Sequence, residues 1–325
     1  MRIAIVGTGG VGGYYGARLA EAGAEVSFLA RGAHLAAIRE RGLRVLSPNG
    51  DIHLPRATAT DRPEDVGPVD VVFISVKLYD TESALALLPP LIGPATVVVS
   101  FQNGVDAVET ITRAVGRRHA AGGTTYLVAA ISEPGVIKHT ALGRLVFGPL
   151  DAAQRPVLEE LHDLCQKARL DVVLSDNIMV EIWAKFVRLT AFSGLTSVTR
   201  RPIGALQTDP DLSVLFRRAV EEAVAVARAK QIPLPPTIVD DIVASTSTMP
   251  PESKSSMLGD LEGGRRLELP WLSGAVVRIG AEVGIPTPTH AFINAVLKPH
   301  VNGGSTGPAG PQGAPGPSGP QGQVR

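Results

Sequence analysis

The sequence predicts an α/β domain built on a mainly parallel sheet, followed by an all-α domain. In the first half, short apolar segments alternate with helical segments, a pattern typical of parallel sheets. From about residue 156 the chain reads as helical. We expect the first domain to span residues 1–170, the second residues 171–302, and a separate tail residues 303–325.

The chain begins with a strand, a glycine-rich turn and a helix. The apolar strand RIAIV (2–6) runs into Gly7-Thr8-Gly9-Gly10-Val11-Gly12, and a second strand follows at 24–30. In this context the spacing G-x-G-x-x-G indicates a Rossmann-type dinucleotide site. The first glycine permits a tight turn, the second lets the backbone approach a pyrophosphate, and the third allows close packing of helix on strand. The alternative is a glycine-rich turn without a ligand.

The end of the second strand bears on the choice of cofactor. A site that prefers NAD places Asp or Glu there, to bind the ribose 2′-hydroxyl. This chain has Ala30 followed by Arg31, and a guanidinium suits a 2′-phosphate. We therefore expect NADPH as the cofactor, with a plain surface role for Arg31 as the alternative.

Two further strands carry polar side chains at their carboxyl ends. The strand at 69–77 ends in Lys77 and precedes a helix across 80–88, and the strand at 95–104 ends in Gln102-Asn103-Gly104 and precedes a helix from about 106. Ligands bind at this edge of a parallel sheet, so Lys77 and Asn103 are expected in the site. A solvated lysine and a turn asparagine are the alternatives. Strands around 120–130 and 136–148 are expected to complete the sheet, partly antiparallel.

A lysine stands in a mostly apolar helix of the second half. After a helix at 156–168 and a short strand at 172–175, Asp176 is expected to cap a helix that contains EIWAKFVRLTAFS (181–193). A helix that is apolar on nearly all sides is normally buried, and a buried ammonium is costly unless it is paired or used. Lys185 is therefore a candidate for chemistry; a surface ion pair with Glu181, four residues earlier, is the alternative. Further helices follow, the longest at roughly 211–230.

Composition excludes several classes of protein. Lys and Arg equal Asp and Glu at 31 each, so nothing indicates binding to nucleic acid or to an anionic membrane. No apolar run is long enough for a signal peptide or a membrane span, and the single Cys165 fits a reducing compartment. We expect a soluble cytoplasmic protein. The seven histidines show no metal-binding spacing, so no metal site is expected.

The end of the chain differs in kind. GPAGPQGAPGPSGPQG (307–322) has glycine at every third position, with proline between. This composition is collagen-like, but the run is too short to hold three chains together unaided. We expect a disordered tail, with a trimerising or partner-binding segment as the alternative.

An ordered set of short motifs runs through the chain. They are GTGGVG at 7–12, ARG at 30–32, VK at 76–77, QNG at 102–104, DNI to WAK between 176 and 185, and SSMLGD at 255–260 followed by Glu268. Together they span about residues 1–300 and resemble the ketopantoate reductase (2-dehydropantoate 2-reductase) family. The resemblance implies a Rossmann-type domain and an all-helical domain that commonly mediates homodimers. It also implies NADPH-dependent reduction of a 2-oxo acid to a 2-hydroxy acid.

The resemblance also implies roles for single residues. Lys185 matches the family's proton donor, Glu268 the carboxylate near the nicotinamide, and Ser256 a serine that contacts substrate. The cofactor contacts that it implies are residues 7–12, Arg31, Lys77, Gln102 and Asn103, and Asn103 would touch substrate as well. Without the resemblance, Glu268 could equally be a surface carboxylate beside Arg265 and Arg266.

The chemistry accounts for a lysine independently. Hydride transfer to a carbonyl carbon creates an alkoxide, and a cationic donor both stabilises and protonates it. Partial desolvation would lower the pKa of Lys185 from its usual value of about 10.4.

The sequence departs from the family at the substrate side. In the family's best-studied form, asparagines follow the lysine four and eight positions later, and another lies in the next loop. Here those positions hold Leu189, Ser193 and Ile203. We expect a more apolar pocket that accepts a 2-oxo acid bulkier or less polar than ketopantoate. Alternatively, the hydroxyls of Ser193, Thr190 or Thr196 replace the lost contacts and preserve the family activity.

Two other functions stay open. The same scaffold could reduce an imine or another carbonyl compound. A non-catalytic NADPH-binding or scaffolding protein, with the tail as its interaction element, is the reading from a different class; retention of Lys185 and Glu268 argues against it.

Overall fold

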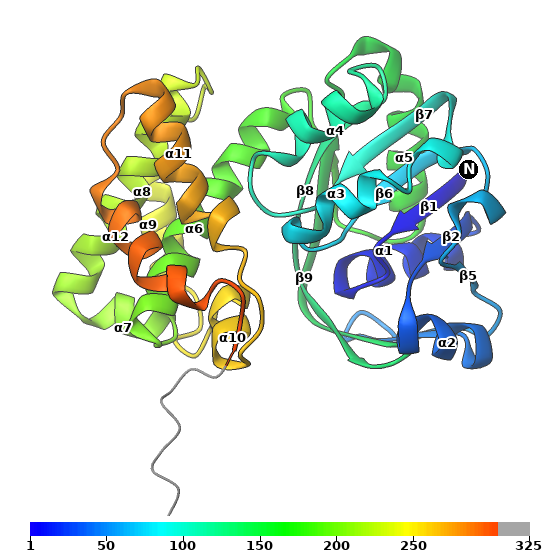
Figure 1. The fold of residues 1–325 in the computed structure, drawn as a ribbon, viewed down its shortest axis with the longest axis horizontal. Helices are drawn as coiled ribbons and strands as arrows, with labels where there is room; N and C mark the ends of the chain where they lie inside the picture. Colours follow the sequence, from blue (N-terminus) through cyan, green and yellow to red (C-terminus); the bar gives the residue numbers. More distant parts are fainter. Residues whose placement is uncertain (305–325) are drawn as a thin grey trace, which may run out of the picture.

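A computed structural model describes residues 1–304, which form a sheet-based unit and a helical unit (Figure 1). This agrees with the predicted fold class of a mainly parallel sheet followed by an all-α domain. The collagen-like repeat expected at 307–322 lies outside the described residues.

The strands of the first unit form one twisted sheet. Their order is β4-β3-β9-β8-β7-β6-β1-β2-β5, with β10 beside β9. Only the pairs β3–β4 and β8–β9 are antiparallel. In chain order the strands are β1 (Arg2–Val6), β2 (Glu25–Leu29), β3 (Leu43–Leu46), β4 (Ile52–Leu54), β5 (Thr58–Thr60), β6 (Val69–Ile74), β7 (Ile92–Ser100), β8 (Ala120–Glu133), β9 (Val136–Gly148) and β10 (Val172–Leu174).

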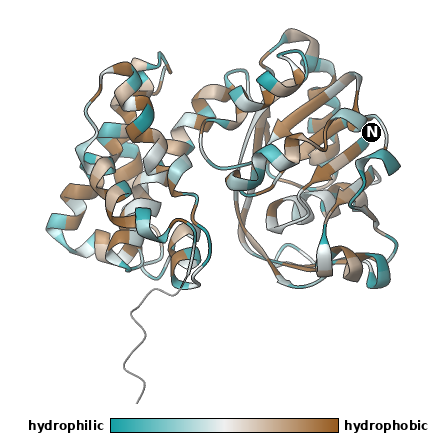
Figure 2. Cartoon of the chain, viewed as in Figure 1, coloured by the Kyte–Doolittle hydropathy of each residue, from teal (hydrophilic) through white to brown (hydrophobic). Residues whose placement is uncertain are grey.

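Helices cover both faces of this sheet. On one face lie α1 (Gly10–Glu21) and α5 (Arg155–Lys167), and on the other α3 (Thr81–Leu85) and α4 (Ala107–Val115). A further helix, α2 (Gly32–Arg41), follows β2. The central strands are mostly apolar and the helices turn hydrophilic residues outward (Figure 2). Strands buried on both faces explain the continuous Val and Ile runs of the sequence.

Some elements differ from the sequence prediction. No strands were expected between 43 and 60, where β3, β4 and β5 lie. Each has only three or four residues, too few for an alternating pattern to stand out. The helix expected across 80–88 is shorter, because a 3-10 turn precedes α3 and Pro89 follows soon after it.

The sheet continues past the predicted domain boundary at residue 170. Strand β10 pairs in parallel with β9, so the first unit extends to Leu174. The helical unit begins with α6 (Ile178–Thr199). The predicted cap of this helix was wrong: Asn177 holds the N-cap position, and the Asp176 carboxylate instead accepts a hydrogen bond from Arg155.

Helix α6 is the centre of the second unit. It packs against α8, α10 and α12, and buries Trp183 and Phe186 edge to face. The other helices are α7 (Ile203–Thr208), α8 (Pro210–Ala229), α9 (Ile238–Ser247), α10 (Ser256–Glu262), α11 (Ser273–Val283) and α12 (Pro288–Leu297). None of the helices within residues 1–304 has both the length and the apolar character needed to cross a membrane.

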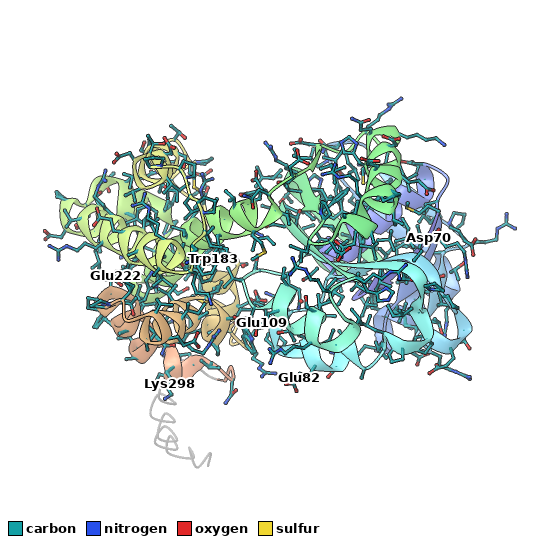
Figure 3. All side chains as sticks on the ribbon, turned by 90° about the horizontal axis from the view of Figure 1, so that it is seen from above. Asp70, Glu82, Glu109, Trp183, Glu222 and Lys298 are labelled. Atoms are coloured by element: carbon teal, nitrogen blue, oxygen red, sulfur yellow. The ribbon has the colours of Figure 1, made fainter. Side chains whose placement is uncertain are left out.

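The amino-terminal half of α6 also touches the sheet. A side chain at Gly122 of β8 would collide with Ile178 of α6, so the glycine permits close contact there. Seen from above, Trp183 marks the helical side of the junction, and Glu82 and Glu109 mark the sheet side (Figure 3). Lys185, in the same half of α6, bonds to Asn103 of the sheet-based unit and therefore lies where the two units meet.

Candidate active site

The carboxyl edge of the central strands gathers the expected cofactor residues. Strands β2, β1, β6 and β7 are parallel neighbours, so the segments that follow them emerge at one edge. Gly7 follows β1, Arg31 follows β2, Lys77 follows β6 and Asn103 follows β7. The topology thus brings together residues that are far apart in sequence.

The glycine turn after β1 fits a dinucleotide. Gly7 has φ +100°, and a side chain there would lie 2.7 Å from Val76. Beyond Gly9 the space is open, since a side chain there would meet no atom within 4 Å. Helix α1 begins at Gly10 with no side-chain cap and no acidic residue in its first turn, which leaves its N–H groups available to a pyrophosphate.

The remaining residues of this turn hold it in place. Thr8 is buried and donates from Oγ1 to the carbonyl of Leu29 at 3.0 Å. Side chains at Gly10 and Gly12 would collide with the backbone oxygens of Ala129 and Gly7, and Val11 packs against the sheet-based core. These contacts hold the turn against the sheet and require glycine at positions 10 and 12.

Arg31 lies at the start of α2. Its side chain is 82% exposed, and its Nη2 lies 3.3 Å from Oδ2 of Asp80, the last residue of the turn after β6. The sequence analysis did not single out Asp80. A guanidinium this exposed is accessible to a 2′-phosphate.

Lys185 is linked to Glu268 through Asn103. The lysine Nζ donates to Oδ1 of Asn103 at 2.9 Å, and Nδ2 of Asn103 donates to Oε2 of Glu268 at 3.3 Å. Because lysine can only donate and a carboxylate only accept, the Asn103 amide has one orientation. Lys185 is partly buried and bonds to Asn103 rather than to Glu181, so the surface-pair alternative was wrong.

Glu268 is buried among donors rather than at the surface. Its residue is 5% exposed, and its Oε1 accepts from the backbone N–H of Leu78 at 3.1 Å. Oε2 also lies 3.5 Å from Nζ of Lys77, which pairs more closely with Asp260 at 2.9 Å. The alternative of a surface carboxylate is therefore wrong. Asp260 was missed as a site residue, although it stands in the SSMLGD motif.

The pKa values of the two lysines shift in opposite directions. Burial lowers the pKa of Lys185 to about 8, and the Glu268 carboxylate partly offsets this effect. Burial also disfavours the Lys77 ammonium, but Glu268 and Asp260 outweigh it and raise the pKa of Lys77. Lys77 therefore keeps its positive charge at neutral pH. Lys185 is mostly protonated there but gives up its proton more readily than an ordinary lysine. The Tyr126 ring, 5.8 Å from Nζ of Lys185, adds a cation–π contact.

Gln102 is engaged within the protein. Its buried side chain donates to the Val76 carbonyl and to Thr81, and its Oε1 accepts from Ser100. It therefore ties the loop after β6 to the end of β7. A direct contact of Gln102 with the cofactor stays a prediction.

The expected substrate residues lie at different depths. Leu189 is partly buried one helical turn beyond Lys185, whereas Ser193 and Ile203 are fully buried. Ser256 is exposed at the start of α10. The buried neighbour Ser255 caps that helix and bonds to Thr196 at 2.8 Å. Contact of Leu189, Ser193 or Ser256 with substrate stays a prediction.

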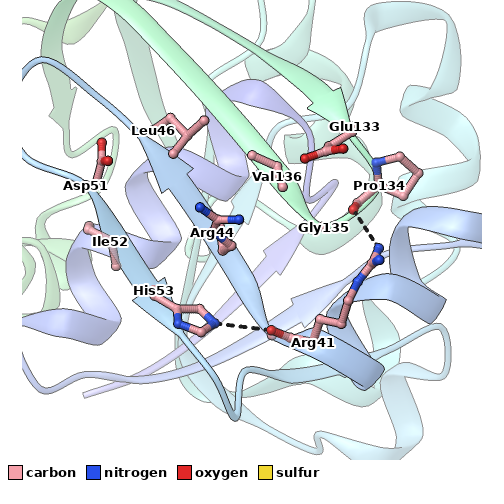
Figure 4. A pocket seen from close by; sticks show the side chains of 11 residues that line it. Arg41, Arg44, Leu46, Asp51, Ile52, His53, Glu133, Pro134, Gly135 and Val136 are labelled. Atoms are coloured by element: carbon pink, nitrogen blue, oxygen red, sulfur yellow. Dashed lines mark hydrogen bonds between the residues drawn. The ribbon is translucent and has the colours of Figure 1, made fainter.

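A separate pocket lies at the far edge of the sheet (Figure 4). Strands β3 and β4 and the turn between β8 and β9 line it, with charges of both signs such as Arg44 and Glu133. It contains none of the residues above. In the described part of the chain, no group of three or more His, Cys, Asp or Glu side chains is arranged to hold a metal.

Comparison with known proteins covers nearly the whole described chain. The family model "Ketopantoate reductase PanE/ApbA" matches residues 3–152, and its C-terminal counterpart matches residues 177–301. A 2-dehydropantoate 2-reductase from Mesorhizobium japonicum is 32% identical, over 91% of this chain and 96% of its own length.

Solved structures of the same family are similar to this chain. A 2-dehydropantoate 2-reductase from Geobacter metallireducens superposes with a TM-score of 0.85 at 32% identity, over 92% of this chain and 99% of its own. A PanE/ApbA family ketopantoate reductase from Ralstonia eutropha has a TM-score of 0.84 at 33% identity, over 92% and 98%. The chain therefore belongs to the ketopantoate reductase family of NADP-dependent oxidoreductases.

Proposed function

We propose that this protein reduces a 2-oxo acid to the 2-hydroxy acid with NADPH, and that Lys185 donates the proton. The observation that carries this proposal is the Lys185–Asn103–Glu268 chain of hydrogen bonds at the carboxyl edge of the sheet. A scaffolding protein would need the glycine turn and Arg31, but not a desolvated amine bonded to Asn103.

The cofactor, when bound, supplies the hydride. Lys185 stabilises the negative charge that develops on the substrate oxygen and then transfers its proton to that oxygen. A pKa of about 8 suits this role, since the amine is mostly protonated at neutral pH and is a stronger acid than an ordinary lysine. Glu268 acts through Asn103 to hold the ammonium in position.

The residues present also fit the cofactor. The open space at Gly9 and the uncapped start of α1 suit the pyrophosphate, and the exposed Arg31 suits the 2′-phosphate. Lys77, Gln102 and Asn103 are proposed to border the nicotinamide half. Of these, Lys77 adds a permanent positive charge.

The substrate is proposed to be bulkier or less polar than ketopantoate. Leu189 places an aliphatic side chain where the resemblance expects an amide. Three hydroxyls were the alternative to this amide. Of these, Thr190 bonds to a carbonyl of its own helix and Thr196 to both Phe192 and Ser255. Of these three residues, only Ser193 has a buried hydroxyl without a hydrogen-bond partner within residues 1–304. One short hydroxyl in place of the expected amides favours a less polar pocket. Ketopantoate itself is the second candidate substrate.

We further propose a homodimer formed through the helical unit. Val214 of α8 and Phe292 and Val296 of α12 are exposed large apolar side chains on adjacent helices. Arg218 and Glu221 lie beside them, so a two-fold axis can bring opposite charges together. A cytoplasmic location stays a prediction that rests on the sequence.

Lys185→Ala is expected to lower kcat by at least about 10²-fold, because the general acid is lost. In the unsubstituted enzyme, kcat/KM should fall about tenfold per pH unit above pH about 8, as the ammonium loses its proton. NADPH oxidation with a panel of 2-oxo acids measures both. Lys254→Ala, which removes an exposed lysine paired with Glu262, is the control. Near-normal turnover by Lys185→Ala would exclude the proposed role.

Glu268→Gln is expected to lower the pKa of Lys185 below about 8, because the carboxylate that raises it is gone. The high-pH limb of the rate profile should then shift to lower pH, and NMR of methylated lysines should report the same shift. Glu262→Gln removes an equal charge from the exposed Lys254 pair and should leave Lys185 unchanged. An unmoved limb in Glu268→Gln contradicts the assigned coupling.

Leu189→Asn is expected to increase kcat/KM for ketopantoate relative to a branched aliphatic 2-oxo acid by roughly 10-fold or more, because a site with a matching amide discriminates strongly. Leu189→Ala, which removes bulk without adding an amide, should not produce this change. The pocket hypothesis is wrong if the unsubstituted enzyme already prefers ketopantoate by orders of magnitude.

Phe292→Glu is expected to convert the dimer into a monomer, since a charge at the centre of the apolar surface opposes its burial. Light scattering after size exclusion measures the mass. Val128→Glu, at an exposed position of β8, should keep the parent mass. A monomeric unsubstituted protein, or a dimeric Phe292→Glu, contradicts the proposal.

A further inference from the structure

The 2′-phosphate site contains an acidic residue as well as a basic one. Arg31 follows β2, Asp80 ends the turn after β6, and the two strands are separated only by β1. Oδ2 of Asp80 accepts a hydrogen bond from Nη2 of Arg31 at 3.3 Å. The chain therefore supplies the cation that NADPH needs together with a carboxylate that competes for it.

Asp80 is available for this competition because its side chain has no other task. It stands at the N-cap position of α3 but makes no side-chain capping bond. Among residues 1–304, Arg31 is the only hydrogen-bond partner of its carboxylate. The Asp80 side chain is 31% exposed, against 82% for Arg31, so the flexible guanidinium is the partner that can turn away toward a ligand.

NADPH and NADH respond differently to such a pair. The 2′-phosphate of NADPH carries up to two negative charges, so it must draw Arg31 away from Asp80 and lie near a like charge. NADH has a neutral hydroxyl at the same position and meets neither cost. We propose that Asp80 is a specificity-determining residue that reduces the preference of this enzyme for NADPH over NADH.

The expected size of the effect is modest. Exposed ion pairs are weak, so the phosphate still gains Arg31, and NADPH still binds. What changes is the ratio of the two dissociation constants. The inference rests on the proposed cofactor site but not on the identity of the substrate.

The test is cofactor binding by the full chain without substrate, followed by the fluorescence of NADPH and of NADH. In Asp80→Asn the Kd for NADPH is expected to fall roughly three- to tenfold, and the Kd for NADH to stay within about twofold. The control is Glu25→Gln. It removes one carboxylate from another exposed pair, Arg2–Glu25, also at 3.3 Å, at the opposite edge of the sheet. This variant should leave both constants unchanged.

A second background tests the mechanism. In Arg31→Ala the gain from Asp80→Asn should become smaller, because the phosphate and Asp80 no longer compete for one cation and only the repulsion between their like charges remains. An unchanged ratio in Asp80→Asn, an equal gain without Arg31, or a loss of NADH binding alone would each overturn the inference. Failure of the enzyme to reduce any 2-oxo acid would leave this test intact, whereas failure to bind either cofactor would remove the site itself.

Discussion

The active site depends on an amine that is taken out of water beside a buried carboxylate. An isolated charge in this position is unfavourable, and burial indeed lowers the pKa of Lys185 to about 8. Asn103 stabilises both buried charges, because its amide accepts a hydrogen bond from Lys185 and donates one to Glu268. Lys77 adds a second positive charge, which pairs with Glu268 and Asp260. Burial therefore makes the lysine more acidic, whereas Glu268 limits that effect and, through Asn103, keeps the lysine in place.

This network explains why the protein needs both units. Asn103 and Lys77 come from loops at the carboxyl edge of the sheet, whereas Lys185, Asp260 and Glu268 come from the helical unit. The sheet contributes the glycine turn and the proposed cationic cofactor contacts. The helical unit contributes the proposed proton donor and the carboxylates beside it. The proposed reaction needs both sets of residues.

The fold was largely predictable because its main elements carry long signals. Apolar strands such as β6 and β7, and the glycine turn in its strand–helix context, identify a parallel sheet without homologues. Strands β3 to β5 were missed because each is too short for a pattern. The cap at Asp176 was wrong because the choice between two adjacent polar residues depends on Arg155, whose position only the tertiary structure determines.

The site was predictable in part. The topology rule placed Lys77 and Asn103 at one edge. The apolar helix singled out Lys185, and the resemblance added Glu268; the roles of these residues stay predictions. Asp80 and Asp260 were not found because each is one carboxylate in a turn or short helix, and only the packed chain shows which cation each faces.

An ion pair between Arg278 of α11 and Asp106 joins the two units outside the network around Lys185. Both carboxylate oxygens of Asp106 lie 2.7 Å from Nη2 of Arg278. Like the Lys77 contacts, it joins polar groups rather than apolar surfaces. Water can solvate these charged groups when they separate. The apolar cluster of the helical unit, however, also includes Val105 and Val146 of the sheet-based unit, so the seam has an apolar part as well. A hinge motion that admits the dinucleotide would therefore separate the ion pairs and pivot about the apolar contact between α6 and the sheet.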